Sequence, residues 1–267
     1  MKKISFTVDL EDPYDIYAVN GRYVDRTRHI LNMCDALNRK ATFFTVGRVA
    51  EAVPDLIAEI AKRGHEVAYH SHAHVSLTKE TPENFARETA MDKKLIESIT
   101  GKPLTGFRAP RFSLTPQSVW VLDVLNEQGF QYSSSIMPTK LSRFGFQNVP
   151  TYAFRWPNGL VEFPLPTAAL YDDFRLGYLG GIYMYLLPTF VTRYFVRKAA
   201  DNEVLWTYTH PYDFDPFEAV QSMSDTPTWA MLVLRLGRLC AERKLRDLLT
   251  EYGGAPLTDC LHSVAAD

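Results

Sequence analysis

The chain has 267 residues, 46% of them hydrophobic, which is enough for one domain with a large core. Its 29 basic and 31 acidic residues nearly balance, so the composition offers no basic field that would hold nucleic acid. The three cysteines, Cys34, Cys240 and Cys260, are far apart, which excludes a CxxC metal site and fits a reducing compartment.

Strand and helix patterns alternate from the first residues onward. The start, MKKISFTVDLED, lacks the long apolar run of a signal peptide, so it predicts a first strand over 4–9 and a cytoplasmic protein. Further strands are predicted at 41–45, 66–69, 105–108, 130–133, 161–163 and 204–209, and helices at 25–39, 54–63, 82–99 and 116–128. This alternation indicates a parallel α/β sheet that closes, or nearly closes, into a barrel. Since no linker or repeat is visible, we expect a single domain over 1–267, with a motif core at about 4–216 and a C-terminal helical part at 217–267.

Two later stretches, 176–196 and 227–239, are rich in large apolar and aromatic residues. Glycines and Pro188 interrupt the first, whereas a membrane-spanning helix needs about 20 uninterrupted apolar residues. Core packing is therefore the favoured interpretation. Because Arg235 and Arg238 interleave with apolar residues, the second choice is a peripheral surface resting on the cytoplasmic face of the inner membrane.

Polar residues gather where the predicted strands end. They are Asp9, Glu11 and Asp12 after the first strand, His70 and His74 after the third, Arg108 after the fourth and His210 after the last. In a parallel α/β barrel the carboxyl ends of all strands share one rim. We therefore expect these side chains to converge at one opening.

Histidines are concentrated in GHEVAYHSHAH, residues 64–74. On a helical turn, His70 and His74 at i and i+4 would place both rings on one face, the spacing of a two-histidine metal clamp. Asp9 and Glu11 alternate along a strand and would face the same side, so we assign Glu11 as the third ligand and Asp9 as the general base. If the chain turns sharply after Leu10, Asp12 takes the ligand role instead. The ligand types suggest Zn²⁺, although Co²⁺, Ni²⁺ and Fe²⁺ suit the same set.

Two further strand ends supply a cation and an imidazole. Arg108, in FRAPRFS, can hold Asp9 as a bidentate partner. Arg111 is assigned to the surface or a substrate groove, and backbone N–H groups around Phe112 could stabilise an oxyanion. His210 ends the last strand opposite the base and is the expected general acid for a leaving amine.

Seven blocks in this order resemble the polysaccharide deacetylases of the NodB-homology type, carbohydrate esterase family 4. They are FTVDLED (6–12), ATFFTVG (41–47), GHEVAYHSHAH (64–74), GFRAPRFSL (106–114), GFQYSSSIMP (129–138), GLVEFPLP (159–166) and LWTYTHPYDFDP (205–216). The first block is similar to the branch with D-x-E-D in place of D-D-G. The resemblance implies a distorted (β/α)7 barrel, a bound divalent metal and hydrolytic removal of N-acetyl groups from amino sugars.

Carried over by position, the resemblance implies that Asp9 is the base, His70 and His74 are ligands, Arg108 orients the base and His210 is the acid. Two departures matter. The metal carboxylate, usually the second Asp of D-D-G, must be Glu11 or Asp12. An acid common in the fifth block is replaced in Tyr132-Ser133-Ser134, so its contact with the catalytic histidine is in doubt.

The expected substrate is an N-acetylated amino sugar of a polysaccharide or a lipid-linked glycan precursor. Phe112, Arg111, Trp206 and Tyr183 are the candidate substrate contacts, the last two as surfaces for sugar rings. Three alternatives remain: a deformylase or deacetylase of an undecaprenyl-phosphate amino sugar in surface-polysaccharide or lipopolysaccharide biosynthesis, a small-molecule cyclic amidase, and a non-catalytic sugar-binding module.

Overall fold

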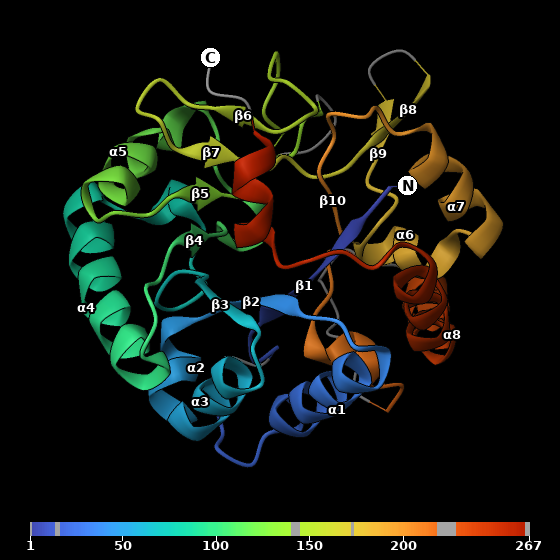
Figure 1. The fold of residues 1–267 in the computed structure, drawn as a ribbon, viewed down its shortest axis with the longest axis horizontal. Coiled ribbons are helices and arrows are strands. Elements are labelled where there is room, and N and C mark those ends of the chain that lie inside the picture. The colour runs from blue at the N-terminus through green and yellow to red at the C-terminus, as the bar shows by residue number, and fades with distance from the viewer. Residues whose placement is uncertain (1, 14–16, 140–144, 172–173, 218–227, 265–267) are drawn as a thin grey trace.

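A curled sheet of eight strands forms the centre of the computed structural model, which describes residues 2–13, 17–139, 145–171, 174–217 and 228–264 (Figure 1). The strand order is β10-β1-β2-β3-β4-β5-β7-β6, and every neighbouring pair is parallel except β6 with β7. The strands are β1 (Ile4–Leu10), β2 (Ala41–Thr45), β3 (Glu66–Tyr69), β4 (Gly106–Phe107), β5 (Tyr132–Ser133), β6 (Phe154–Arg155), β7 (Val161–Glu162) and β10 (Leu205–Trp206). The α/β barrel-like fold predicted from the sequence is confirmed.

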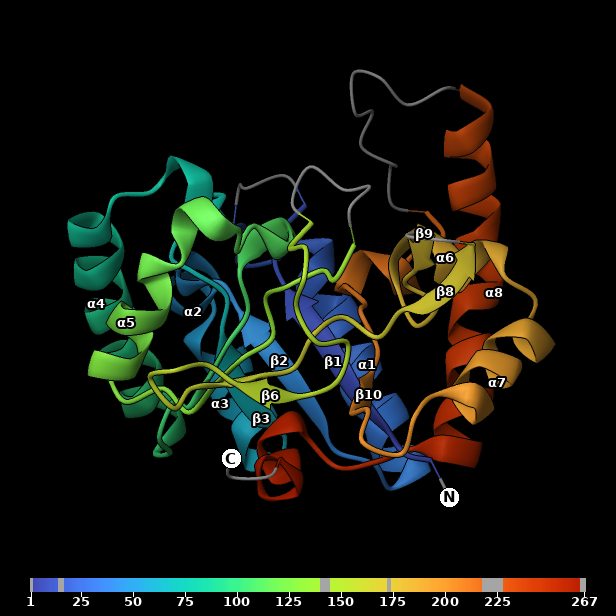
Figure 2. The same cartoon turned by 90° about the horizontal axis from the view of Figure 1, so that it is seen from above.

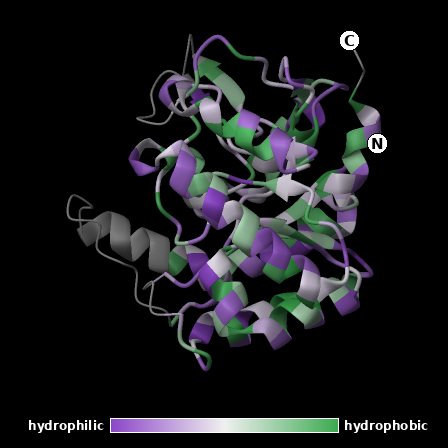
Figure 3. Cartoon of the chain, turned by 90° about the vertical axis from the view of Figure 1, so that its left-hand side faces the viewer, coloured by the Kyte–Doolittle hydropathy of each residue, from purple (hydrophilic) through white to green (hydrophobic). Residues whose placement is uncertain are grey.

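Helices cover the outer side of the sheet (Figure 1). They are α1 (Arg22–Leu37), α2 (Gly47–Ala52), α3 (Pro54–Lys62), α4 (Pro82–Thr100), α5 (Trp120–Glu127), α6 (Gly181–Leu186), α7 (Thr189–Lys198) and α8 (Thr228–Tyr252). Hydrophilic and hydrophobic residues alternate along the outer helices (Figure 3), as expected for helices with one face on the core. A hairpin of β8 (Ala168–Tyr171) and β9 (Phe174–Leu176) and five short 3₁₀ turns complete the described elements.

Strand β1 shows how polar side chains come to lie inside the barrel. All seven of its residues are buried. Phe6, Val8 and Leu10 belong to the main hydrophobic core, whereas Thr7 and Asp9 alternate with them. The side chains of Thr7 and Asp9 meet the Arg108 guanidinium, which comes from the end of another strand. The inside of the barrel therefore holds a buried polar network.

The two ends of the sheet approach each other without a strand ladder between them in the described part of the chain. The indole N–H of the fully buried Trp206 in β10 donates to the Pro164 carbonyl beyond β7, at 3.1 Å. This side-chain hydrogen bond spans the opening, and the sheet is a curled half-barrel.

The apolar stretch 176–196 forms the end of β9, α6 and α7, and Pro188 lies between the two helices. Tyr178, Leu179, Met184 and Val196 are buried, so core packing accounts for much of it. Among the described residues, no helix combines the length and apolar character needed to cross a bilayer. Arg238 is buried and does not present a charge to a membrane, and the Arg235 side chain lies outside the described residues.

Candidate active site

The carboxyl ends of β1, β3, β4 and β10 meet at one rim of the half-barrel. Asp9 lies in β1, and His70, Arg108 and His210 directly follow or closely follow the other three strands. Parallel pairing aligns the ends: Asp9 pairs with Phe44 in β2, and Tyr69 in β3 pairs with Phe107 in β4. Side chains separated by 200 positions in the sequence are thereby brought together.

Three side chains form a group that could hold a metal ion: Glu11, His70 and His74, whose ligand atoms all lie within 4.8 Å of one another. Glu11 Oε2 is 2.7 Å from His74 Nε2 and 3.9 Å from His70 Nε2. That oxygen is buried and, apart from this contact with His74, has no hydrogen-bond donor in the described part of the structure. Asp12, the alternative ligand, is turned elsewhere, and its Oδ2 accepts the Tyr17 backbone N–H at 2.6 Å.

Electrostatics favour an ionised Glu11. Burial alone would raise its pKa, but the charge and hydrogen bond of His74, with the charges of His210 and His70, outweigh burial and lower the pKa to about 2. A carboxylate beside two imidazoles suits a divalent cation, so the donor set fits the metal that the sequence predicts.

The expectation that His70 and His74 lie on a helical turn is wrong. Both are in the loop after β3, where Ser71 and His74 have left-handed backbone angles, φ 64° and 53°. The Gly47 N–H donates to the Ser71 carbonyl at 2.9 Å and fixes the loop to the start of α2. The turn of the loop, not helical periodicity, brings the two ring centroids to 5.1 Å.

His70, a candidate ligand, is held in its neutral form. Its Nδ1–H donates to the Arg108 carbonyl at 2.8 Å, which leaves the Nε2 lone pair facing Asp9 and Glu11. Burial lowers the pKa of His70 to about 4, more than the nearby carboxylates raise it. The imidazole therefore needs no deprotonation near neutral pH before it can coordinate a cation.

Arg108 fixes Asp9 from inside the barrel. The guanidinium is completely buried, donates from Nη1 to Asp9 Oδ1 at 2.5 Å, and lies 3.9 Å from the Phe44 ring centroid and 4.2 Å from that of Trp206. A bidentate contact with Asp9 was expected, but only Nη1 donates to this carboxylate. Nη1 also donates to the Thr7 hydroxyl, and the other two nitrogens donate to Ser134. Asp9 Oδ2 consequently faces His70 Nε2 at 3.5 Å.

His210 lies on the other side of Glu11, with Nε2 3.8 Å from Glu11 Oε1. Its Nδ1 is 3.2 Å from Asp213 Oδ2, and its backbone N–H donates to the same oxygen at 2.8 Å. Burial lowers the pKa of His210, but Asp213, Glu11 and Asp9 together overcome this and raise it to about 9. His210 is therefore protonated at neutral pH, with Nε2 pointing towards the candidate metal group.

Sequence reasoning missed Asp213. The available signal was the i, i+3 spacing of histidine and aspartate in HPYD, where His210 caps the 3₁₀ turn η4 (Pro211–Phe214) and the Asp213 carboxylate accepts the His210 backbone N–H. Asp213 is the carboxylate that contacts His210, a role left without a candidate by the serines of the fifth block.

The four predicted substrate contacts differ in how far their side chains are exposed. Trp206 is completely buried against Arg108, so it lacks the exposed face that sugar stacking requires. Phe112 is buried, and its backbone N–H already donates to the Ala109 carbonyl at 3.1 Å. Tyr183 packs against the main core, whereas Arg111 is exposed with a left-handed φ of 58°.

His72, between the two candidate ligands, faces away from them. Its Nδ1 is 3.2 Å from both carboxylate oxygens of the buried Asp92, which also accepts the Tyr69 hydroxyl at 2.9 Å. With Glu51 these residues form a second group of possible ligands. Its carboxylate and imidazole already pair with each other and hold the histidine loop against α4.

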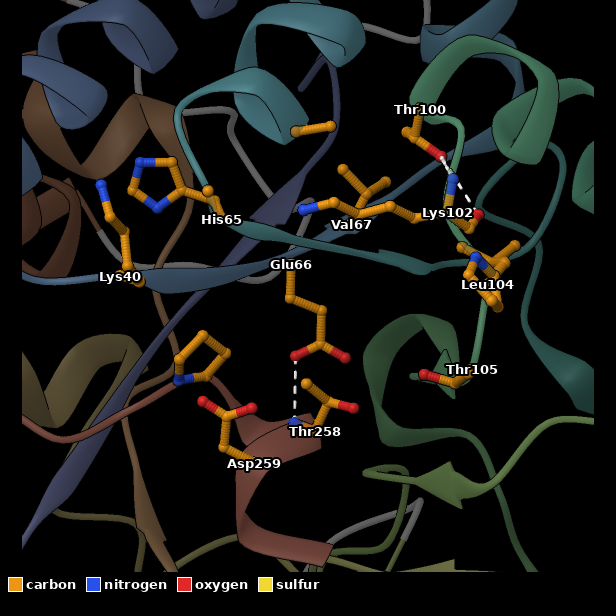
Figure 4. A pocket seen from close by; sticks show the side chains of 14 residues that line it. Lys40, His65, Glu66, Val67, Thr100, Lys102, Leu104, Thr105, Thr258 and Asp259 are labelled. Atoms are coloured by element: carbon orange, nitrogen blue, oxygen red, sulfur yellow. Dashed lines mark hydrogen bonds between the residues drawn. The ribbon is translucent and has the colours of Figure 1, made fainter.

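A cavity of about 380 Å³ lies at the opposite, amino ends of β2, β3 and β4 (Figure 4). Glu66, on its lining, accepts the Thr42 and Tyr132 hydroxyls and the Thr258 N–H. His65 accepts the Ala41 N–H, and burial lowers its pKa to about 4. These groups tie the strands to the C-terminal segment, and none belongs to the rim described above.

Two family profiles together match most of the chain. Residues 2–133 match the family described as polysaccharide deacetylase, and residues 134–260 match one described as a domain of unknown function, DUF3473. A peptidoglycan-N-acetylglucosamine deacetylase from Bacillus cereus is 28% identical over 97 residues, 36% of this chain and 33% of that protein. A chitooligosaccharide deacetylase from Bradyrhizobium is 30% identical over 99 residues, 37% of this chain and 43% of that protein. The matches thus span well under half the length of these relatives.

Solved structures share the fold. A Mycobacterium smegmatis protein described as a polysaccharide deacetylase superposes with a TM-score of 0.60 at 18% identity, covering 98% of this chain and 89% of that one. A CE4 family pseudoenzyme from Bacillus anthracis superposes with a TM-score of 0.51 at 14% identity, covering 100% and 68%. Because a pseudoenzyme shares the fold, the chemistry must be argued from the side chains at the rim.

Proposed function

Because the chain belongs to the polysaccharide deacetylase family, we propose that it is a metal-dependent hydrolase that removes an N-acetyl group from an amino sugar. The sugar belongs to a polysaccharide or to a lipid-linked glycan precursor. The observation that carries the proposal is the convergence of a base, three potential ligands and a protonated imidazole at one rim. The deacetylase descriptions of the Bacillus cereus and Bradyrhizobium relatives support the amino-sugar class.

The proposed ligands are Glu11, His70 and His74, and the proposed ion is Zn²⁺. A divalent ion bound there supplies a Lewis acid that polarises the amide carbonyl and makes water more acidic. The protein prepares the site by keeping His70 neutral and Glu11 ionised. The buried Glu11 Oε2, which has no hydrogen-bond donor apart from His74 in the described structure, is the atom that a cation would satisfy.

Asp9 is the proposed general base. Its Oδ1 is occupied by Arg108, while Oδ2 faces the ligand histidine at 3.5 Å and is the oxygen placed to accept a proton from the attacking water. Arg108 holds the carboxylate in one orientation because its own guanidinium lies between two aromatic rings. The water oxygen forms a bond to the carbonyl carbon of the amide. The tetrahedral intermediate that results can then lose its carbon–nitrogen bond.

His210 is the proposed general acid. Asp213 accepts a hydrogen bond from the Nδ1–H of His210, so the Nε2 proton is directed at the candidate metal group and can be given to the departing amine nitrogen. As the carbon–nitrogen bond breaks, the amine leaves neutral, and acetate and a free amino sugar are the products. The base and the acid thus stand on opposite sides of the proposed ligand Glu11.

A lipid-linked amino sugar is the second candidate substrate, and it would place the protein at the cytoplasmic face of the inner membrane. Exposed apolar side chains favour it: Phe190 is 71% exposed and Leu239 is 62% exposed. Exposed apolar residues mark contact with lipid or another apolar partner where they form one contiguous patch.

The test is acetate release from N-acetylated oligosaccharides and from undecaprenyl-linked N-acetylamino sugars, with formylated analogues alongside. The Zn²⁺-loaded protein should release acetate, the chelated protein should not, and added Zn²⁺ should restore the rate. His74→Ala should behave like the chelated protein, whereas His29→Gln, a change at a distant half-exposed histidine, should leave the rate unchanged. Acetate release that is indifferent to chelation would contradict the proposal.

A further inference from the structure

We infer that Tyr185 of α6 and Arg238 of α8 are positioning residues that hold the acid His210 in its productive orientation through Asp213 and Tyr212. The inference rests on the proposed function, because it assumes that His210 donates a proton. It assigns a task to the segment 134–260, which matches a family of unknown function. That segment would supply both the acid and the residues that orient it.

The first observation is that the two oxygens of Asp213 have different partners. Oδ2 receives the His210 backbone N–H at 2.8 Å and faces its Nδ1 at 3.2 Å. Oδ1 accepts the Tyr185 hydroxyl in a short hydrogen bond. Asp213 is buried, so its orientation is set by these contacts and not by water. Removing the Tyr185 hydroxyl would leave one carboxylate oxygen buried without this donor.

Tyr185 can act only as a donor to this carboxylate. Burial and the charge of Asp213 raise its pKa well above the usual value, and Arg238 offsets part of that rise. The phenol therefore keeps its proton over the working pH range. One oxygen of the carboxylate accepts a hydrogen bond that orients it, and the other oxygen accepts a hydrogen bond from the imidazole. This arrangement fixes the orientation of a catalytic histidine.

The second observation is the stacking beside His210. The Tyr212 ring stacks on the His210 ring with centroids 4.5 Å apart and an interplanar angle of 12°. The Arg238 guanidinium carbon lies 5.4 Å from the centroid of the same Tyr212 ring. The Tyr212 hydroxyl donates to Glu11 Oε1 at 3.4 Å. Arg238 is thus linked through one aromatic ring to both the proposed acid and a proposed ligand.

The third observation is how closely α8 approaches α6, which lies beside it in Figures 1 and 2. A Cβ atom on Gly237 would lie 2.4 Å from Tyr185 Cβ, a distance that no side chain tolerates. Glycine at this position lets the helix backbone rest directly on Tyr185 and places the next residue, Arg238, beside the tyrosine. Close packing at one glycine therefore couples the C-terminal helix to the acid.

The test compares two acetyl substrates that differ in the need for an acid. An amino-sugar amide needs a proton on its leaving nitrogen, whereas 4-nitrophenyl acetate loses a stable phenolate without one. For the Zn²⁺-loaded full chain, Tyr185→Phe should lower kcat on the amide about 10-fold, leave KM unchanged and change the ester rate less than about twofold. Arg238→Met should show the same selectivity with a smaller loss.

Matched controls exist for both changes. Tyr178→Phe removes another buried hydroxyl, one without a hydrogen-bond partner in the described structure, and Arg243→Met removes an exposed charge from the same helix. Both should leave the two rates unchanged. Equal losses on amide and ester in Tyr185→Phe, or no loss on either, would overturn the inference.

A signal that does not depend on turnover separates this inference from the proposed function. In ¹H–¹⁵N spectra of the protein, the Nδ1 proton of His210, assigned by its loss in His210→Asn, should be shifted far downfield by Asp213. Tyr185→Phe should move that resonance and Tyr178→Phe should not. An unmoved resonance overturns the inference even if the enzyme is active. A moved resonance in a protein that hydrolyses neither substrate leaves the positioning intact and refutes the proposed hydrolase.

Discussion

Two histidines at the rim are held in opposite protonation states by their surroundings. Burial dominates at His70 and lowers its pKa to about 4. At His210 burial acts in the same direction, but Asp213 and the other carboxylates overcome it and raise the pKa to about 9. A neutral imidazole suits a metal ligand and a protonated one suits an acid, so the environments match the two proposed roles.

The pH dependence of kcat should carry the signature of His210. An acid must hold its proton, so kcat should fall on the alkaline side as pH rises through the His210 pKa, which Asp213 holds above the usual value. Asp213→Asn removes the main charge that raises this pKa, and the fall should begin at lower pH. Rate profiles of the Zn²⁺-loaded enzyme from neutral to strongly alkaline pH would measure it. An alkaline limb that Asp213→Asn leaves in place would refute the assignment.

Most of the candidate site could be predicted from residue types at strand ends. Asp9, His70, Arg108 and His210 were expected to converge because parallel strands share a rim, and the structure brings them together. Glu11 was assigned as the ligand ahead of Asp12, but Asp12 stayed open as the alternative because the choice depends on where the strand stops. Trp206 could not be ruled out as a stacking surface from the sequence, because burial and not residue type decides whether an aromatic ring can contact a sugar. In the structure this ring is completely buried.

Among the elements, the predicted parallel strands appear in the sheet, and the helices at 25–39, 54–63 and 82–99 appear with shifted ends. Helix α2 was not among the predicted helices, and it begins at Gly47, two residues after the end of β2. The structure gives this glycine a steric reason, since a Cβ there would lie 2.1 Å from the Asp92 carboxylate. The histidine loop was wrongly expected to be helical, because local spacing does not report left-handed residues such as Ser71.

A single glycine in α8 offers a test at the scale of elements. In an ordinary helix interior, glycine to alanine stabilises by about 1 kcal/mol. Gly237→Ala should instead lower the Tm, because the new Cβ meets Tyr185 Cβ at 2.4 Å and neither atom can rotate away. It should also lower kcat on the amide. Thermal unfolding measures the first effect, with Thr250→Ala on the exposed face of the same helix as the control. A raised Tm would contradict this packing.

At the scale of the whole molecule, the two family segments share one sheet. Strand β1 pairs with β2 from its own segment and with β10 from the other, and β5, which ends at residue 133, pairs with β4 and β7. The proposed base and ligands come from the first segment and the proposed acid from the second. The boundary between the two sequence families therefore crosses both the sheet and the site.

The predicted single domain leads to one expected outcome. Because strands of both segments pair in one sheet, the chain should unfold in one cooperative transition in scanning calorimetry. The calorimetric and van't Hoff enthalpies of unfolding should agree. Zn²⁺ should raise the Tm, since it binds the folded protein. Two separable transitions, one of them insensitive to the metal, would show that the segments are independent domains.

The proposed hydrolase activity depends above all on where a divalent ion binds. Anomalous diffraction from crystals grown with Zn²⁺ locates that ion directly. We expect a strong peak about 2.0–2.2 Å from Glu11 Oε2, His70 Nε2 and His74 Nε2, the distances of zinc to carboxylate and imidazole ligands. A peak confined to the group of Glu51, His72 and Asp92, or no bound ion at all, would contradict the proposed metal site at Glu11, His70 and His74.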